Sequence, residues 1–322
     1  MDAALPPPGQ VDQWRLGMPA EGLSSRVGTI AFTASALLDG RREAGPAIPL
    51  HTAMAEELPR ATSVLVRLPE YRGKSLIPVL SWLVVNRLAH PGAEASWYLH
   101  KQQGPASCAA LLTRLGWRDV RHKREGGLVR VTGLPPRSAE LPEAKAFSGA
   151  IGSVELDFLA DYGVFSPGHV DDGTALLAEV ALRQSPVEVL ADIGVGYGPL
   201  AIGLVRNGVA RRAVATDVDC LALWLAERNA AANGVPLTVE CTPDPLDVEP
   251  TPLTVCNVPT HIPADLSTAL TNALAERVRD GGKLLAVVHA SLEQRYAHKL
   301  AAAGVKVARH PGPAHVVLEA RR

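Results

Sequence analysis

The clearest pattern along the chain is a regular exchange of short apolar runs and longer amphipathic stretches after residue 187. The short runs are rich in β-branched residues, and Ala- and Leu-rich stretches of helical length follow most of them. Strands that alternate with helices are typical of βαβ units, which build parallel sheets. The expected strands are 187–191, 213–216, 237–241, 253–256 and 283–289. The expected helices are 199–207, 220–232, 264–279 and 292–303.

The chain closes on a different pattern, in which two short strands flank a Pro-Gly-Pro turn. Residues 305–309 and 314–320 predict an antiparallel hairpin. We therefore expect an α/β domain over residues 141–322, with a Rossmann-like sheet of seven strands that ends in this hairpin.

The N-terminal half repeats the later part of this scheme. Landmark residues fall in register, since Pro69 and Gly92 are 23 positions apart, as are Pro259 and Gly282. This spacing favours an internal duplication, although any two α/β domains can share similar spacings. The expected elements are strands 61–67 and 96–100, helices 75–88 and 106–115, and a hairpin over 117–133. A proline-rich linker at 133–142 then separates a first domain, residues 1–140, from the second.

Composition narrows the class of protein. The 322 residues are 47% hydrophobic and 20% charged, as in globular domains, and we find no apolar run long enough to span a bilayer. The N-terminus lacks the basic start and apolar stretch of a signal peptide. The four cysteines lie far apart and form no C-x-x-C pair, so neither a zinc site nor a disulfide framework is indicated. We expect a cytoplasmic protein without a metal site and without a membrane anchor.

The net charge of -1 hides an asymmetry between the two halves. Residues 1–145 hold 18 Lys and Arg against 13 Asp and Glu, whereas the remaining residues hold 14 against 20. The densest basic stretch is Arg114, Arg118, Arg121, Lys123, Arg124 and Arg130. Such a patch can contact a phosphate backbone, but it can equally be the solvated surface of a hairpin.

The strongest chemical signal is E-V-L-A-D-I-G-V-G-Y-G at residues 188–198, where a buried strand runs into three glycines. Glycines let the backbone turn sharply and approach a ligand without a Cβ in the way. Asp192 precedes Gly194, Gly196 and Gly198, giving the order D-x-G-x-G-x-G. A leading carboxylate suits a ligand that carries an ammonium group better than one that carries a pyrophosphate.

Two further acids follow the next strands. Asp217 ends the second strand of the domain, where a carboxylate can accept both hydroxyls of a ribose. Asp244 comes just after the third strand, where its side chain can accept from an adenine amino group. Two acids at consecutive strand ends around this glycine order predict a nucleoside cofactor.

These residues resemble class I S-adenosylmethionine-dependent methyltransferases over roughly residues 147–322. The resemblance implies S-adenosyl-L-methionine as the cofactor. It places the three glycines against the methionine part, Asp217 at the ribose, Asp244 at the adenine and Asp192 near the methionine amino group.

A narrower resemblance is to the tandem-domain ribosomal-RNA guanine-N2 methyltransferases of the RsmC and RlmG type, whose N-terminal domain has lost its cofactor motifs. Nothing in residues 1–140 reproduces the D-x-G-x-G-x-G pattern. Residues 161–166 (D-Y-G-V-F-S) and 171–174 (D-D-G-T) resemble the start of that family's catalytic domain. The likeness implies a degenerate first domain that docks ribosomal RNA or a ribosomal subunit.

The sequence departs from this family at the catalytic motif. Members that methylate amines carry N-P-P-[FYW] after the fourth strand, and this chain has Asn257-Val258-Pro259-Thr260-His261. Asn257 and the Val258 carbonyl can still orient an exocyclic amine, and Phe165 is the best candidate for an aromatic lid. His261 can offer a flat surface or be an ordinary loop histidine, and His289 is not assigned as a base.

Three classes of function remain open. The first is N-methylation of a guanine in ribosomal RNA, with the basic first domain binding the RNA. The second is methylation of a small metabolite or a natural-product amine, which needs no aromatic ring for stacking. The third is a non-catalytic RNA-binding protein that retains the fold. We expect a monomer, although the sequence leaves the oligomeric state open.

Overall fold

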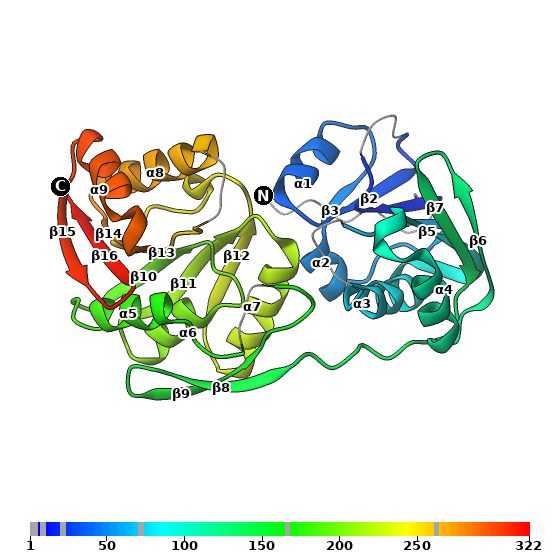
Figure 1. Cartoon of the computed structure of the whole chain (residues 1–322), viewed down its shortest axis with the longest axis horizontal. Helices are drawn as coiled ribbons and strands as arrows, with labels where there is room; N and C mark the ends of the chain where they lie inside the picture. The colour runs from blue at the N-terminus through cyan, green and yellow to red at the C-terminus, as the bar shows by residue number, and fades with distance from the viewer. Residues whose placement is uncertain (1–5, 7–10, 20–23, 70–73, 165–167, 261–263) are drawn as a thin grey trace. The chain divides into compact units, whose positions relative to one another are not determined.

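The structure, a computed structural model, describes residue 6 and residues 11–19, 24–69, 74–164, 168–260 and 264–322. The chain divides into two compact units, Met1–Ala144 and Lys145–Arg322 (Figure 1). Each unit is built on a seven-stranded sheet with helices packed against it. The tandem Rossmann-like architecture expected from the sequence is confirmed.

The sheet of the second unit has the strand order β12-β11-β10-β13-β14-β16-β15. The first five strands of that order are parallel, and β16 is antiparallel to both of its neighbours, so the expected terminal hairpin is present. The strands are β10 (Val187–Ile193), β11 (Ala210–Asp217), β12 (Leu237–Cys241), β13 (Leu253–Asn257), β14 (Lys283–His289), β15 (Lys306–Pro311) and β16 (His315–Arg321).

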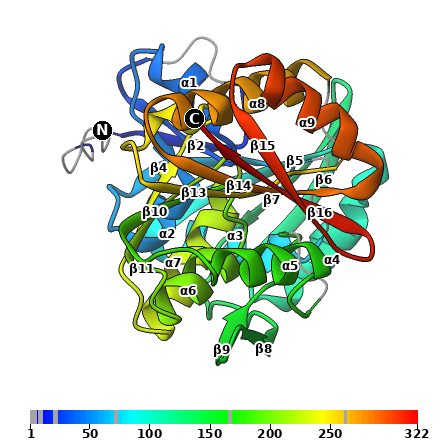
Figure 2. The same cartoon turned by 90° about the vertical axis from the view of Figure 1, so that its left-hand side faces the viewer.

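Helices cover both faces of this sheet (Figure 2). One layer holds α5, α6 and α7, and the other holds α8 and α9. A separate hairpin, β8 with β9, packs against α6 and α7. The bounds are β8 (Ala146–Ile151), β9 (Val154–Leu159), α5 (Asp172–Ala181), α6 (Pro199–Arg206), α7 (Cys220–Ala232), α8 (Ala264–Arg279) and α9 (Glu293–Ala302), with single 3-10 turns η3 (Pro245–Asp247) and η4 (Ala290–Leu292).

Three of these helices end where the sequence predicts. Gly234, Gly281 and Gly304 follow α7, α8 and α9, and each has a positive φ, of 66°, 99° and 84°. A left-handed residue just after a helix lets the chain turn away while the last carbonyls find partners. The expected helix stops are therefore confirmed, and they return the chain to the sheet for the next strand.

The first unit repeats the second position by position, with the strand order β3-β2-β1-β4-β5-β7-β6. Such a match is what an internal duplication produces. The strands are β1 (Gln13–Leu16), β2 (Val27–Ala31), β3 (Ala47–Pro49), β4 (Ala61–Arg67), β5 (Ala89–Leu99), β6 (Arg118–Glu125) and β7 (Leu128–Leu134). The helices are α1 (Ala34–Arg41), α2 (Leu50–Ala55), α3 (Leu76–Leu83) and α4 (Pro105–Arg114), with a π-helical turn η1 (Val84–Leu88) and a 3-10 turn η2 (Lys101–Gln103).

Several details of the first unit differ from the expectation. The five elements before residue 60, from β1 to α2, are not among the expected ones. The strand expected at 96–100 begins at Ala89, and the helix expected at 75–88 is α3 followed by the π-helical turn. In the part of the chain that the structure describes, no helix is long and apolar enough to cross a membrane.

Candidate functional site

The predicted site residues gather at the carboxyl ends of three adjacent strands in the second unit. β10 is central, with β11 and β13 as its neighbours, and the chain leaves β10 toward β11 but returns on the other side at β13. Ligands of open α/β sheets bind at such a reversal of strand order. Asp192 is the next-to-last residue of β10, Asp217 ends β11 and Asn257 ends β13, so the topology brings all three to one edge of the sheet.

The glycine loop after β10 is strained in a way that only glycine tolerates well. Gly194, Gly196 and Gly198 have φ values of 77°, 58° and 94°. A Cβ added at Gly194 or Gly196 would meet no atom within 4 Å, so both positions border open space. A Cβ at Gly198 would lie 2.9 Å from Ile202 Cδ1 and 3.3 Å from Ala226 Cα. The first two glycines therefore face room for a ligand, and the third lets α6 pack against α7.

Asp217 braces the glycine loop from the neighbouring strand. Its Oδ2 accepts a hydrogen bond from the Gly196 backbone N–H at 2.9 Å, and its Oδ1 accepts from the Asp219 N–H at 2.9 Å. The carboxylate is half-buried. Each carboxylate oxygen has two lone pairs and can accept more than one hydrogen bond.

Asp192 is a buried carboxyl group below the same loop. It is 2% exposed, and its Oδ2 accepts from the Ala201 N–H of α6 at 3.0 Å. Burial raises the pKa of Asp192 to about 7, the Ala201 hydrogen bond opposes the shift, and the negative charge of Asp217 adds to it. A cationic group placed beside Asp192 would favour its ionised form.

Asp244 lies on the loop that follows β12, and its side chain is exposed. Its Oδ1 caps η3 by accepting from the Leu246 N–H at 2.9 Å. Arg277 of α8, only 5% exposed, holds this loop through its guanidinium group. That group donates to the backbone carbonyls of Pro245, Val248 and Glu249 at 2.7–3.2 Å. No pattern in the sequence indicates this anchor.

Asn257 has a fixed side-chain orientation. Its Nδ2 donates to Asp171 Oδ1 at 3.2 Å and to Thr174 Oγ1 at 3.0 Å. Asp171 also caps α5, because Oδ1 accepts from the Thr174 N–H at 3.0 Å and Oδ2 accepts from its hydroxyl at 2.7 Å. An ionised carboxylate only accepts, so the NH2 of Asn257 must face it. The amide oxygen of Asn257 is therefore not the atom that faces Asp171.

The residues after Asn257 extend the strand. The Val258 N–H donates to the Val287 carbonyl of β14 at 3.0 Å, and Val258 is 4% exposed. A proline at this position has no N–H for that bond, so here the sheet itself holds the backbone that a rigid proline would restrain. Pro259 and Thr260 are exposed. Phe165 and His261 lie outside the described residues.

Asn229 of α7 is a second supporting residue that the sequence did not reveal. It is 1% exposed, and its Nδ2 donates to the Tyr197 carbonyl of the glycine loop at 2.8 Å and to the Leu159 carbonyl at 2.9 Å. Its Oδ1 accepts from the Leu159 N–H at 2.7 Å. This single amide therefore ties α7 to the loop and to the end of β9.

The first unit lacks the chemistry of this edge. In the first unit the Gly17 N–H donates to the Ile30 carbonyl, just as the Gly194 N–H donates to the Thr216 carbonyl in the second unit. Gly17 therefore occupies the position of Gly194. This register puts Ala31 at the position of Asp217, and Arg15 at that of Asp192. A Cβ at Gly17 would lie 2.5 Å from Phe32 Cε2, so a side chain fills the space above the loop. The first domain is therefore degenerate, as the sequence predicts.

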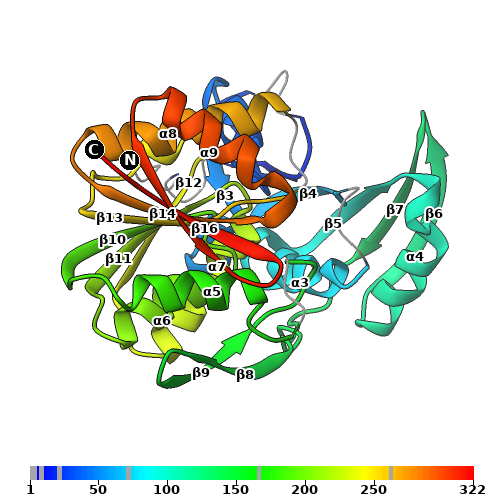
Figure 3. The ribbon, with the colours of Figure 1, turned by 60° about the vertical axis from the view of Figure 1, so that its left-hand side comes forward.

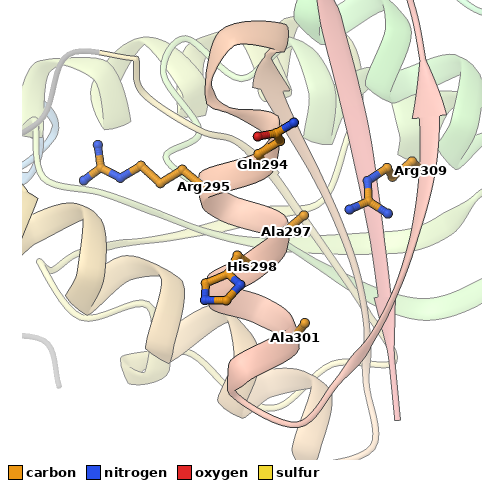
Figure 4. Close-up of a pocket in the computed structure, with 6 residues that line it drawn as sticks. All are labelled: Gln294, Arg295, Ala297, His298, Ala301 and Arg309. Carbon is orange, nitrogen blue, oxygen red and sulfur yellow. The ribbon is translucent and has the colours of Figure 1, made fainter.

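Other groups in the second unit do not join the site. His289 is exposed, its Nδ1 contacts Ser291 at 2.7–3.3 Å, and its ring lies edge-on to His315. Among the described residues, no cluster of three or more His, Cys, Asp or Glu side chains could hold a metal ion. A shallow depression of about 610 Å³ lies between α9 and β15 (Figure 4). None of the site residues described above lines it, and we assign it no function.

Comparisons with known proteins agree with this geometry. Residues 155–309 match the methyltransferase small domain family. Over 230 residues the chain is 30% identical to a ribosomal RNA small subunit methyltransferase C of Pseudomonas fluorescens, covering 69% of this chain and 68% of that protein. It is 28% identical over 262 residues to the protein of the same name in Hahella chejuensis, covering 78% of this chain and 73% of that protein.

A solved structure has the same two-domain fold. It is a 16S rRNA N2-guanine methyltransferase of T. thermophilus in complex with AdoMet and guanosine, and it superposes with a TM-score of 0.72. The superposition covers 97% of this chain and 88% of that chain, at 22% sequence identity. At this identity the similarity establishes the fold.

Proposed function

Because this chain belongs to the family of the ribosomal RNA small subunit methyltransferase C proteins, we propose that it methylates the exocyclic amine of a guanine in ribosomal RNA. The methyl donor is S-adenosyl-L-methionine. The observation that supports the proposal is the fixed side chain of Asn257 at the end of β13, whose NH2 group donates to Asp171 and Thr174 and so leaves the amide oxygen for an acceptor amine.

The residues of the strand edge fit this cofactor. The open space above Gly194 and Gly196 leaves room for its methionine part against the backbone. Asp217 ends β11, where a carboxylate can accept from ribose hydroxyls, and exposed Asp244 can accept from the adenine amino group. Asp192 lies below the loop, where the positive ammonium of the methionine part would favour its ionised state. When bound, the cofactor supplies an electrophilic methyl group.

Asn257 and Val258 would position the acceptor nitrogen. The Asn257 Oδ1 accepts one hydrogen of the amine and the Val258 carbonyl accepts the other, which holds the nitrogen lone pair toward the methyl group. Asp171 and Thr174 keep the amide from turning over, because a flipped amide would bring its oxygen against a carboxylate. Positioning of this kind can supply much of the acceleration of a group transfer.

The motif N-V-P-T leaves a second candidate function for this chain. Thr260 is exposed and has no ring with which to stack on a base. A methyltransferase of a small metabolite or natural-product amine needs no such ring, so that function is the alternative. A non-catalytic RNA-binding role is disfavoured, because open space remains above Gly194 and Gly196.

Transfer of a tritiated methyl group separates the candidates. Labelled cofactor is incubated with the full chain and, in parallel, total RNA, protein-stripped small ribosomal subunits and a metabolite extract. The proposal predicts label in the ribosomal RNA. Label in the metabolite extract alone would favour the alternative, and no transfer to any of the three would contradict both enzymatic functions.

A further inference from the structure

The two units differ most on one face of their sheets. In the second unit this face lies under α5 and α6, because Asp192 bonds to α6 and Asn257 bonds to the cap of α5. The part of this face on β13, β14 and β16 is apolar beside the two site residues. Four of its residues are fully buried, and they lie in two rows across the strands: Val255 beside Leu285, and Val287 beside Val317.

The equivalent face of the first unit has a different character. Strand pairing places Leu65, Ser96, Tyr98 and Arg130 at the four positions just named. The two rows continue with charged residues at both ends. One row reads Arg15, Leu65, Ser96, Thr132 and Arg121, and the other reads Arg67, Tyr98, Arg130 and Lys123. We call these nine residues the open face; Ser96 and Thr132 are buried among the others, and the remaining seven are partly or fully exposed.

No helix of the described residues covers most of the open face. The chain between β1 and β2 contains no described helix in place of α6, and none precedes β1 in place of α5. Helix α1 packs against β2 and β3, where Gly40 approaches Thr29 and Ala47. Helices α3 and α4 lie on the opposite face, where Trp117 bonds to Ser81 and contacts Trp97 (Figure 3).

The charge of this surface is strongly positive. Five of the nine residues are cationic. The acids beside them are Glu94, which pairs with Arg121, and Glu125, which pairs with Arg130. Arg15, Arg67 and Lys123 have no ion-pair partner among the described residues. Tyr98 stands between Arg67 and Arg130 and is half-buried, so part of its surface is available to a ligand.

We propose that the open face binds a single-stranded segment of RNA, with phosphates on its arginines and lysine and a base on the Tyr98 ring. This inference rests on the proposed function, because it names how the substrate RNA is held. Phosphates supply most nonspecific affinity for nucleic acid, and sheet aromatics that stack unpaired bases favour single strands. Where no described helix covers the sheet, its strands offer the surface that such binding needs.

The open face also divides the basic stretch 114–130 into two groups. Arg121, Lys123 and Arg130 belong to the open face, whereas the side chain of Arg124 lies on the side of α3 and α4, since residues alternate along β6. Arg114 is exposed at the end of α4. The pair Arg114 and Arg124 is therefore a matched control for the pair Arg121 and Lys123.

The test uses the full chain and two charge-reversed variants of equal net charge, Arg121→Glu/Lys123→Glu and Arg114→Glu/Arg124→Glu. Binding of a fluorescein-labelled 20-nucleotide single-stranded RNA is measured by anisotropy over a range of salt concentrations. Each phosphate contact contributes about 0.7 to the logarithmic salt slope, so the open-face variant should lose about 1.4 and the control far less. Tyr98→Ala should weaken binding about fivefold or more without changing the slope, and Tyr98→Phe should restore most of the affinity.

Equal losses in the two charge-reversed variants would overturn the assignment, because the affinity would then follow overall charge and not this face. Competition by duplex RNA as effective as by single strands would also contradict it. Circular dichroism and S-adenosylhomocysteine calorimetry establish that each variant is folded. The proposed function fails separately, if the unmodified chain transfers no methyl group to ribosomal RNA while the binding results stand.

Discussion

Replacement of Asp171 by alanine tests how the acceptor residue is held. The change removes the partner of Asn257 Nδ2 at 3.2 Å and both bonds to Thr174, at 3.0 and 2.7 Å. Asn257 then keeps only its contact with the Thr174 hydroxyl, at 3.0 Å. That hydroxyl has itself lost the group to which it donates, so the amide of Asn257 becomes free to rotate.

The expected loss of turnover follows from the charge of the missing partner. Free interchange of the two amide orientations would by itself lower kcat only about twofold, because half of the molecules would still present the oxygen. A hydrogen bond to a charged group contributes about 1.5–3 kcal/mol. If this restraint is expressed at the transition state, kcat should fall by about 10- to 150-fold. The lost helix cap should also lower the free energy of unfolding by about 0.5–2 kcal/mol.

The assay measures kcat for methyl transfer to ribosomal RNA, with cofactor affinity followed separately by calorimetry. Asp172→Ala is the matched control, since Asp172 is the exposed acid in the first turn of the same helix. Asp171→Asn retains an oxygen for the Asn257 amide and removes the charge, which separates geometry from electrostatics. An Asp171→Ala enzyme with unchanged kcat, or a control that loses as much, would refute this reasoning.

Three further predictions concern the cofactor edge. Asp217→Ala should weaken binding of S-adenosylhomocysteine tenfold or more in calorimetry, and unchanged affinity in a folded variant would contradict the ribose assignment. Burial raises the pKa of Asp192 to about 7, and an ammonium group requires the ionised form; affinity should therefore fall up to tenfold per pH unit below about 7, and Asp192→Asn should abolish this dependence. Gly198→Ala should lower the free energy of unfolding in urea by about 1–3 kcal/mol, because the added Cβ is strained and contacts α7. Gly194→Ala should lower the free energy of unfolding less but should weaken cofactor binding more, because its Cβ enters the space left for the ligand.

The second unit was predictable because its signals are local. Short β-branched runs, helical stretches and glycine stops follow one another within a few residues, and the strand ends then place Asp192, Asp217 and Asn257 at one edge. The first sixty residues carry weaker signals. Their strands hold only three to five residues, and β1 alternates half-buried Gln13 and Arg15 with buried apolar positions, since no described helix covers one of its faces.

The supporting residues of the site could not be predicted, because their contacts are distant in sequence. Asn257 lies 86 residues from Asp171, and Asn229 lies 70 residues from Leu159. The basic stretch was visible as composition, but its division between two faces depends on the register of β6 against β7. Side-chain direction in a strand changes with a shift of one residue, which a charge pattern alone does not reveal.

The most direct test of the account is to identify the methylated nucleoside. The full chain and Asn257→Ala are each incubated with isotope-labelled cofactor and protein-stripped small-subunit ribosomal RNA. The RNA is then digested to nucleosides, which are separated by chromatography and identified by mass spectrometry. The account predicts labelled N2-methylguanosine from the unmodified chain, and about 10²-fold less from Asn257→Ala at unchanged cofactor affinity. Label in a different nucleoside, or an equally active Asn257→Ala enzyme, would contradict it.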